Sequence, residues 1–266
     1  MIKFTKAHAY GNDFLYVEQT EVVGVTLAAL TRDMCDRHAG VGADGLIVYG
    51  RTATGATMQL FNADGGRAEV SGNGVRGLAA LLLQGDARAD AVVTIETEAG
   101  KKAVARLKNS TTRQTFRTAM GLPADLRQAP VVMVGETIQA VVMNFGNPQC
   151  VVLGPLPTED RLRRLGSALE HHAMFPDGTN VEFAVVEQPD SVRILIWERG
   201  VGPTSSSGTG SCAALVAAAA FGGASRDATV IAPGGAQRVE WREDGVYLTG
   251  WAEVLCEGEW FRERPR

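Results

Sequence analysis

Short apolar runs interrupted by polar residues recur along the whole chain, and they predict half-buried β-strands. In one run Val192, Ile194 and Ile196 occupy every second position, as expected for a strand with one buried face. A hairpin is expected to turn at Ala99-Gly100. The strand-like runs read DFLYVE, GLIVY, VVTIET, AVVMNF, VEFAVV, VRILIW, RVEW and GVYLTGW.

Four segments carry helical patterns. Residues 26–37 and 158–170 are amphipathic, whereas residues 73–84 and 209–221 are apolar nearly all round. A helix that is apolar on every face has to be buried on every face. Glycines that favour helix termination follow both of these apolar segments, at Gly85 and at Gly222-Gly223.

The order of these pieces recurs about 135 positions later, which indicates a duplicated domain. The matching pairs are Gly11-Asn12 with Gly146-Asn147, Asp44-Gly45 with Asp177-Gly178, and Ser71-Gly72-x-Gly74 with Ser207-Gly208-x-Gly210. The pattern predicts an α/β fold of two pseudo-symmetric halves, each a curved, mostly antiparallel sheet around a central buried helix. If the halves face one another, both serines and both helix starts can meet at a shared cleft.

The boundary between the halves is expected near 115–130, where MGLPADLRQAP (120–130) has the polar, proline-bearing composition of a linker. The first half is predicted to span 1–118 and to be completed by a C-terminal strand at 252–266. The second half is predicted to span 119–251.

Composition narrows the function classes. With 45 % hydrophobic and 21 % charged residues, the chain has an ordinary globular balance. A net charge of -4 argues against nucleic acid as a partner, and no apolar run is long enough to span a membrane. Four scattered cysteines and no metal-type spacing favour free thiols, a cytoplasmic location and no metal site.

The two Ser-Gly-x-Gly stretches stand where the buried helices begin. The first turn of a helix has unpaired backbone N–H groups and a positive dipole end, so it favours an anion such as a carboxylate. Ser71 and Ser207 can also be plain N-caps, a role that serine fills well. Capping and ligand contact are compatible.

A dinucleotide cofactor is not expected. Gly72-x-Gly74-x-x-Gly77 fits the dinucleotide fingerprint, but it follows NADGGRAEV, which is polar where a buried parallel strand is required. Gly40-x-Gly42-x-x-Gly45 leads from a helix into a strand, the reverse of the required order.

Six blocks along the chain resemble diaminopimelate epimerases, in that family's order and spacing. They are HAYGNDF, CDRHAGVGADG, FNADGGRAEVSGNGVR, FGNPQC, FPDGTNVEF and WERGVGPTSSSGTGSCAA. The resemblance implies a cofactor-independent enzyme that interconverts LL- and meso-diaminopimelate in lysine and peptidoglycan biosynthesis. Family members act on a small amino-acid substrate and often form homodimers, so the resemblance also implies that a homodimer is possible for this chain.

The resemblance also implies roles for particular residues. Two bases work on opposite faces of the α-carbon, at the positions of Ser71 and Ser207. Gln149 and Glu198 occupy positions that tune the pKa of those bases. The substrate-binding positions are Asn12, Gly45, Asn62, Gly72, Asn73, Asn147, Asn180, Glu198, Arg199, Gly208 and Thr209.

The sequence departs from the family at the bases themselves. Both are cysteines in the family, and a serine hydroxyl is far less acidic than a thiol. The position of Gln149, which cannot titrate, carries histidine in the family, and Pro203 replaces a more usual acidic residue. Three interpretations stay open: an engineered Cys-to-Ser variant, a paralogue that binds an amino acid without epimerising it, and an isomerase with relocated acid–base groups. Gln149 and Pro203 favour natural divergence.

Overall fold

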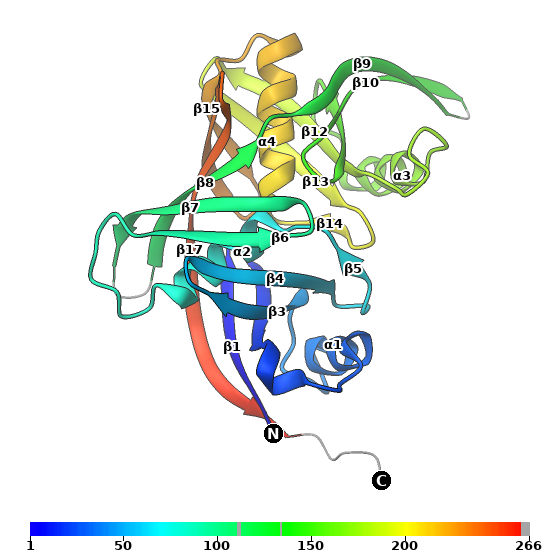
Figure 1. Ribbon diagram of the computed structural model, residues 1–266. Coiled ribbons are helices and arrows are strands. Elements are labelled where there is room, and N and C mark those ends of the chain that lie inside the picture. Colours follow the sequence, from blue (N-terminus) through cyan, green and yellow to red (C-terminus); the bar gives the residue numbers. More distant parts are fainter. Residues whose placement is uncertain (111–112, 134, 262–266) are drawn as a thin grey trace. The chain divides into compact units, whose positions relative to one another are not determined.

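The computed structural model describes residues 1–110, 113–133 and 135–261. The chain divides into two compact units (Figure 1). Unit 1 comprises Met1–Arg117 and Trp251–Arg266, and unit 2 comprises Thr118–Gly250. These limits lie one residue from the boundaries expected from the sequence.

Unit 1 contains two α-helices and seven complete strands among the described residues. In chain order they are β1 (Ile2–Ala9), β2 (Asn12–Glu18), the 3-10 turn η1 (Gln19–Val22), α1 (Leu27–Cys35), β3 (Gly45–Thr52), β4 (Gly55–Asn62), β5 (Arg67–Ala68), α2 (Gly72–Leu82), β6 (Val92–Thr97) and β7 (Gly100–Asn109).

Unit 2 repeats this plan. Its elements are β9 (Ala124–Met133), β10 (Glu136–Asn144), β11 (Pro148–Leu153), α3 (Glu159–Glu170), β12 (Asn180–Gln188), β13 (Ser191–Glu198), β14 (Gly202–Thr204), α4 (Gly208–Ala217), the π-helical turn η2 (Ala218–Gly222), β15 (Asp227–Ala232) and β16 (Gly235–Arg242). Two further strands, β8 (Arg113–Gly121) and β17 (Gly245–Trp260), are divided between the units.

Each α-helix lies in the connection between two parallel strands. Helix α1 joins β2 to β3, α2 joins β4 to β6, α3 joins β11 to β12, and α4 joins β13 to β15. Parallel strands need such crossovers, whereas the remaining strand pairs with printed registers are antiparallel. The two halves therefore share one topology, which confirms the predicted fold class.

The central helices are buried as their all-apolar patterns require. Residues 72–81 of α2 and every residue of α4 are buried. The core of unit 1 packs around Leu78 and Ala79 of α2, and the core of unit 2 packs around Ala213 and Val216 of α4. Figure 1 shows α4 among the strands of unit 2, where it contacts β12, β13 and β15.

The predicted linker at 120–130 is wrong. This stretch forms the end of β8 and most of β9, and β9 pairs with β10, with Pro130 opposite Gln139. Only Leu122 and Pro123 lie between the two strands. Proline is tolerated where a strand's N–H groups are not needed for pairing, so composition alone was misleading. The predicted C-terminal strand is β17, which ends at Trp260; residues 262–266 lie outside the described residues.

The strand registers also correct one of the internal matches. Gly45 pairs with Phe14 in the parallel β2–β3 ladder, and Asn180 pairs with Gln149 in the parallel β11–β12 ladder. The counterpart of Gly45 is therefore Asn180, two positions beyond the Gly178 that the sequence match suggested.

Gly77 of α2 provides a test of this packing. A Cβ at this position would lie 2.0 Å from the Oη of Tyr16, a buried side chain that donates a hydrogen bond to the carbonyl of Gly74 at 3.0 Å. Gly77→Ala, which in an ordinary helix interior stabilises by about 1 kcal/mol, should here lower the free energy of unfolding by about 1–3 kcal/mol in urea titrations. The loss should be smaller in a Tyr16→Phe background. Stabilisation by Gly77→Ala would contradict the described packing.

Candidate functional site

Both serines are N-caps of the buried helices. Ser71 Oγ accepts a hydrogen bond from the backbone N–H of Gly74, and Ser207 Oγ accepts one from that of Gly210, each at 3.1 Å. Both serines have extended backbones, as N-cap residues do. The interpretation of the two serines as N-caps is thus correct, and Gly72-Asn73 and Gly208-Thr209 begin the first turns of the two helices.

In unit 1 a chain of buried amides runs to the start of α2. The Asn12 side-chain amide donates to Asp44 Oδ2 at 2.9 Å, and the Asn73 amide donates to Asn12 Oδ1 at 3.2 Å. Arg76 in turn donates to Asn73 Oδ1. The structure therefore brings two predicted binding residues, Asn12 and Asn73, into direct contact, and adds Asp44 and Arg76, which were not predicted.

Gly45 and Asn62 face each other in the β3–β4 ladder. A Cβ at Gly45 would lie 2.5 Å from the carbonyl oxygen of Phe61 and 3.2 Å from the Phe14 ring, so this place in the sheet admits only a backbone. The Asn62 N–H donates to the Gly66 carbonyl at 2.8 Å in the turn that follows β4.

Unit 2 has a matching amide chain. The Gln149 side-chain amide donates to Asn147 Oδ1 at 2.7 Å, and the Asn147 amide donates to Thr209 Oγ1 at 3.3 Å. Gln149 is fully buried. Its side chain therefore orients Asn147 at the start of α4 and, being an amide, supplies no titratable group.

Asn180 and Arg199 form a second polar group in unit 2. The backbone N–H of Arg199 donates to Asn180 Oδ1 at 3.0 Å, and the Asn180 amide donates to the Pro148 carbonyl at 3.2 Å. The Arg199 guanidinium also donates to the Asp177 carbonyl at 3.1 Å. Glu198 is the last residue of β13 and is half-buried, as is Arg199. This end of β13 thus carries one charge of each sign.

Glu182 on β12 is a site-facing residue that the sequence analysis missed. It is fully buried, and neither carboxylate oxygen has a hydrogen-bond partner among the described residues. Burial, followed by the nearby charge of Glu198, raises its pKa well above the ordinary 4.5. Its Oε1 lies 2.5 Å from the point that a Cβ on Gly210 would occupy, beside the first turn of α4.

The same place in unit 1 is apolar. A Cβ on Gly74, the counterpart of Gly210, would meet Ile47 Cδ1 at 2.7 Å. Ile47 is the second residue after Gly45, just as Glu182 is the second residue after Asn180. Aligning the halves by these strands would have revealed the carboxyl from the sequence.

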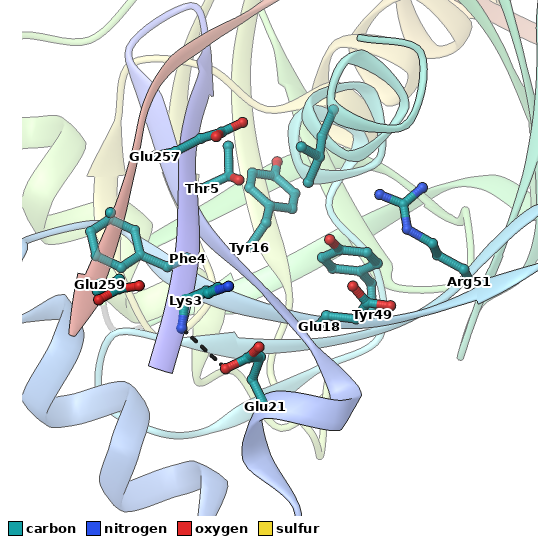
Figure 2. Close-up of a pocket in the computed structure, with 12 residues that line it drawn as sticks. Lys3, Phe4, Thr5, Tyr16, Glu18, Glu21, Tyr49, Arg51, Glu257 and Glu259 are labelled. Atoms are coloured by element: carbon teal, nitrogen blue, oxygen red, sulfur yellow. Dashed lines mark hydrogen bonds between the residues drawn. The ribbon is translucent and has the colours of Figure 1, made fainter. Parts of the chain in front are cut away.

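A separate hollow of about 520 Å³ lies in unit 1 (Figure 2). Its twelve lining residues include Lys3, Glu21, Tyr49 and Arg51, with the Lys3 N–H donating to Glu21 at 3.4 Å. None of the twelve is a predicted site residue. This hollow is therefore distinct from the polar groups at the helix starts.

The polar groups at both helix starts fall within regions that match a known family. A family model described as diaminopimelate epimerase matches residues 4–123 and 141–255. The chain belongs to this family. It is 38 % identical to the diaminopimelate epimerase of Desulforudis audaxviator, over 98 % of this chain and 100 % of that protein. It is 36 % identical to that of Nostoc punctiforme, over 97 % and 99 %.

Solved structures show the same fold at low identity. A probable proline racemase from Agrobacterium radiobacter superposes with a TM-score of 0.77 at 16 % identity, covering 99 % of this chain and 94 % of that one. A predicted epimerase from Pseudomonas aeruginosa superposes with a TM-score of 0.75 at 14 % identity, covering 99 % and 100 %. The diaminopimelate epimerase family is one of amino-acid isomerases, so by family the scaffold is that of an amino-acid epimerase.

No described helix has the length and apolar character needed to cross a membrane. All four cysteines are free thiols; Cys35, Cys150 and Cys212 are buried, and Cys256 is exposed.

Replacing the buried carboxyl should stabilise unit 2. A carboxyl with a raised pKa binds its proton more tightly in the folded state, so its contribution to stability is lost as pH rises from about 4.5 through the folded pKa. Glu182→Ile, which copies Ile47, lacks this loss. Its free energy of unfolding should therefore rise relative to that of the parent by up to about 1.4 kcal/mol for each pH unit in that window. Urea unfolding at several pH values measures this difference.

Glu187 on the same strand is the matched control for that measurement. Its carboxylate is exposed and its pKa is lowered by Arg193, so it stabilises the fold above its ordinary pKa and not below. Glu187→Gln should accordingly show the opposite sign, with a small loss near neutral pH that fades in acid. If the stability gained by Glu182→Ile does not change with pH, the raised pKa of Glu182 is contradicted.

Proposed function

We propose that this chain binds 2,6-diaminopimelate with its carboxylate at the start of α4 and does not invert the α-carbon. Support for binding comes from the amide chain that ends on Thr209, beside a helix N-terminus suited to a carboxylate. The opposite charges of Glu198 and Arg199 suit the ammonium and carboxylate of the substrate's far end.

The observation that carries the second half of the proposal is the state of the two serines. Inversion without a cofactor needs an acid–base group on each face of the carbon, and in this family the two serine positions supply them. Here both positions carry hydroxyls that cap helices, and the neighbour of the Ser71 cap is the methyl group of Ile47. An apolar neighbour such as Ile47 cannot take the proton of the Ser71 hydroxyl, so one face of the carbon lacks its base.

Binding can be measured by calorimetry and by the line width of diaminopimelate protons. LL-diaminopimelate should bind without forming the meso isomer. Arg199→Ala should weaken binding by about 10- to 100-fold, as expected for loss of charge-assisted hydrogen bonds. Arg163→Ala is the control, because that exposed side chain pairs with Glu159 on the outside of α3. Equal effects of the two substitutions would refute the placement of the ligand.

Restoring thiols tests the missing chemistry. A thiol at a helix start ionises near neutral pH, whereas the serine hydroxyl does not. The double variant Ser71→Cys/Ser207→Cys should convert LL- to meso-diaminopimelate at least about 10²-fold faster than the parent, a typical gain from general acid–base catalysis. Chiral chromatography of the products measures it. Inversion by the parent at the rate of the double variant would overturn the proposal.

A further inference from the structure

The fold does not require a carboxyl at the position of Glu182. Its counterpart Ile47 fills the same place beside α2 with an apolar side chain. A buried carboxyl without hydrogen bonds destabilises a protein, so such a group in a protein core is a candidate for a functional role. The two halves thus share a backbone and differ in acid–base chemistry at one matched position.

The oxygen of Ser207 lies close to this carboxyl. The point that a Cβ on Gly210 would occupy is 2.5 Å from Glu182 Oε1 and 3.0 Å from Ser207 Oγ. The two oxygens are therefore separated by no more than the sum of these distances, although no hydrogen bond joins them, and only a glycine at position 210 lets both lie there. The cap hydrogen bond from the Gly210 N–H holds the serine oxygen in this place.

We propose that Glu182 is a positioning residue that acts through Ser207 and makes unit 2 alone competent to exchange the α-hydrogen of the ligand. This inference rests on the proposed function, because the ligand's carboxylate must lie at the start of α4. Glu182 then supplies the titratable group that the serine itself lacks.

The proton transfer balances within these groups. A rotation of the Glu182 side chain first brings its carboxylate within hydrogen-bond distance of Ser207 Oγ. Ser207 Oγ then takes the α-hydrogen as a proton while its own hydroxyl proton passes to the Glu182 carboxylate. The electron pair of the broken C–H bond stays on the ligand, where the α-carboxylate at the helix start takes up the charge. In D₂O the hydrogens on both oxygens are replaced by deuterium, and the reverse transfer places deuterium on the α-carbon from the same face.

The groups around Glu182 favour a carboxyl that loses its proton at a pH above the ordinary pKa of glutamate. Burial and the charge of Glu198 on β13 raise its pKa. Cys150 on β11 is a buried thiol whose own pKa is raised by burial and by Glu182. Helix α4 presents Gly210 to the carboxyl and carries one titratable side chain, Cys212. Gln149 Oε1 also has no hydrogen-bond donor among the described residues, as is true of both Glu182 carboxylate oxygens.

The experiment incubates LL- and meso-diaminopimelate with the protein in D₂O and follows the α-proton signals by NMR. The parent should exchange the α-hydrogen of one configuration only, with retention, and the rate should rise with pH to a plateau above the pKa of Glu182. Glu182→Gln and Glu182→Ile should bind the ligand equally well and lose at least 10-fold in exchange rate. Glu182→Asp should recover part of the rate and of the pH profile. Glu187→Gln should behave as the parent.

The outcomes separate the two proposals. Binding without exchange in the parent, or exchange that Glu182→Gln leaves unchanged, would overturn the role of Glu182 and leave the binding function standing. A parent that binds neither isomer would overturn the proposed function and this inference with it. A measurement without ligand does not depend on either proposal about binding. The carboxyl ¹³C signal of Glu182 is assigned as the one that disappears in Glu182→Gln. If this signal titrates near pH 4.5, the inference is wrong.

Discussion

The start of a helix that is buried on every side is the constraint on which this structure depends. Backbone N–H groups in the first turn of α2 and of α4 have no partner within the helix, and burial removes the water that would otherwise satisfy them. Ser71 and Ser207 satisfy one such group each, and the amide chains through Asn12 and Asn147 surround the helix starts with oriented dipoles. The start of a buried helix favours an anion in general, so the proposed binding of a carboxylate is compatible with the way the cores are built.

Duplication gives both units this frame, and single positions then decide its chemistry. Ile47 and Glu182 occupy equivalent places beside the first helical turn, as do Phe14 and Gln149 in the parallel ladders. In each pair the unit 2 residue is polar and the unit 1 residue is apolar. Because the backbone pairing is the same in both units, these differences do not change the fold. They make unit 2 the half with buried acceptors and a titratable carboxyl.

Much of the fold could be predicted from local patterns, because the patterns reflect burial directly. The stretches that are apolar on all faces form α2 and α4, and Val92–Thr97 forms β6. The linker at 120–130 failed because proline and charged residues also suit the exposed face of a paired strand such as β9. Glu182 was missed because its importance depends on a partner 28 positions away, at Gly210, and because the match of Asp44-Gly45 with Asp177-Gly178 shifts the alignment of the two halves by two positions in this region. Long-range pairing of this kind leaves no local signal.

Serine at the base positions separates the stability of the helix starts from their acid–base chemistry. Serine is among the best N-cap residues, so its hydroxyl preserves, or strengthens, the cap that anchors each central helix. The same hydroxyl ionises far less readily than a thiol, so a serine at this position is a weaker acid–base group on its own while the cap is kept. A chain can therefore pass from the thiol to the hydroxyl form without disturbing its cores. Any proton transfer that it retains must then depend on a neighbouring group, and Glu182 is the buried carboxyl that faces one of the two caps.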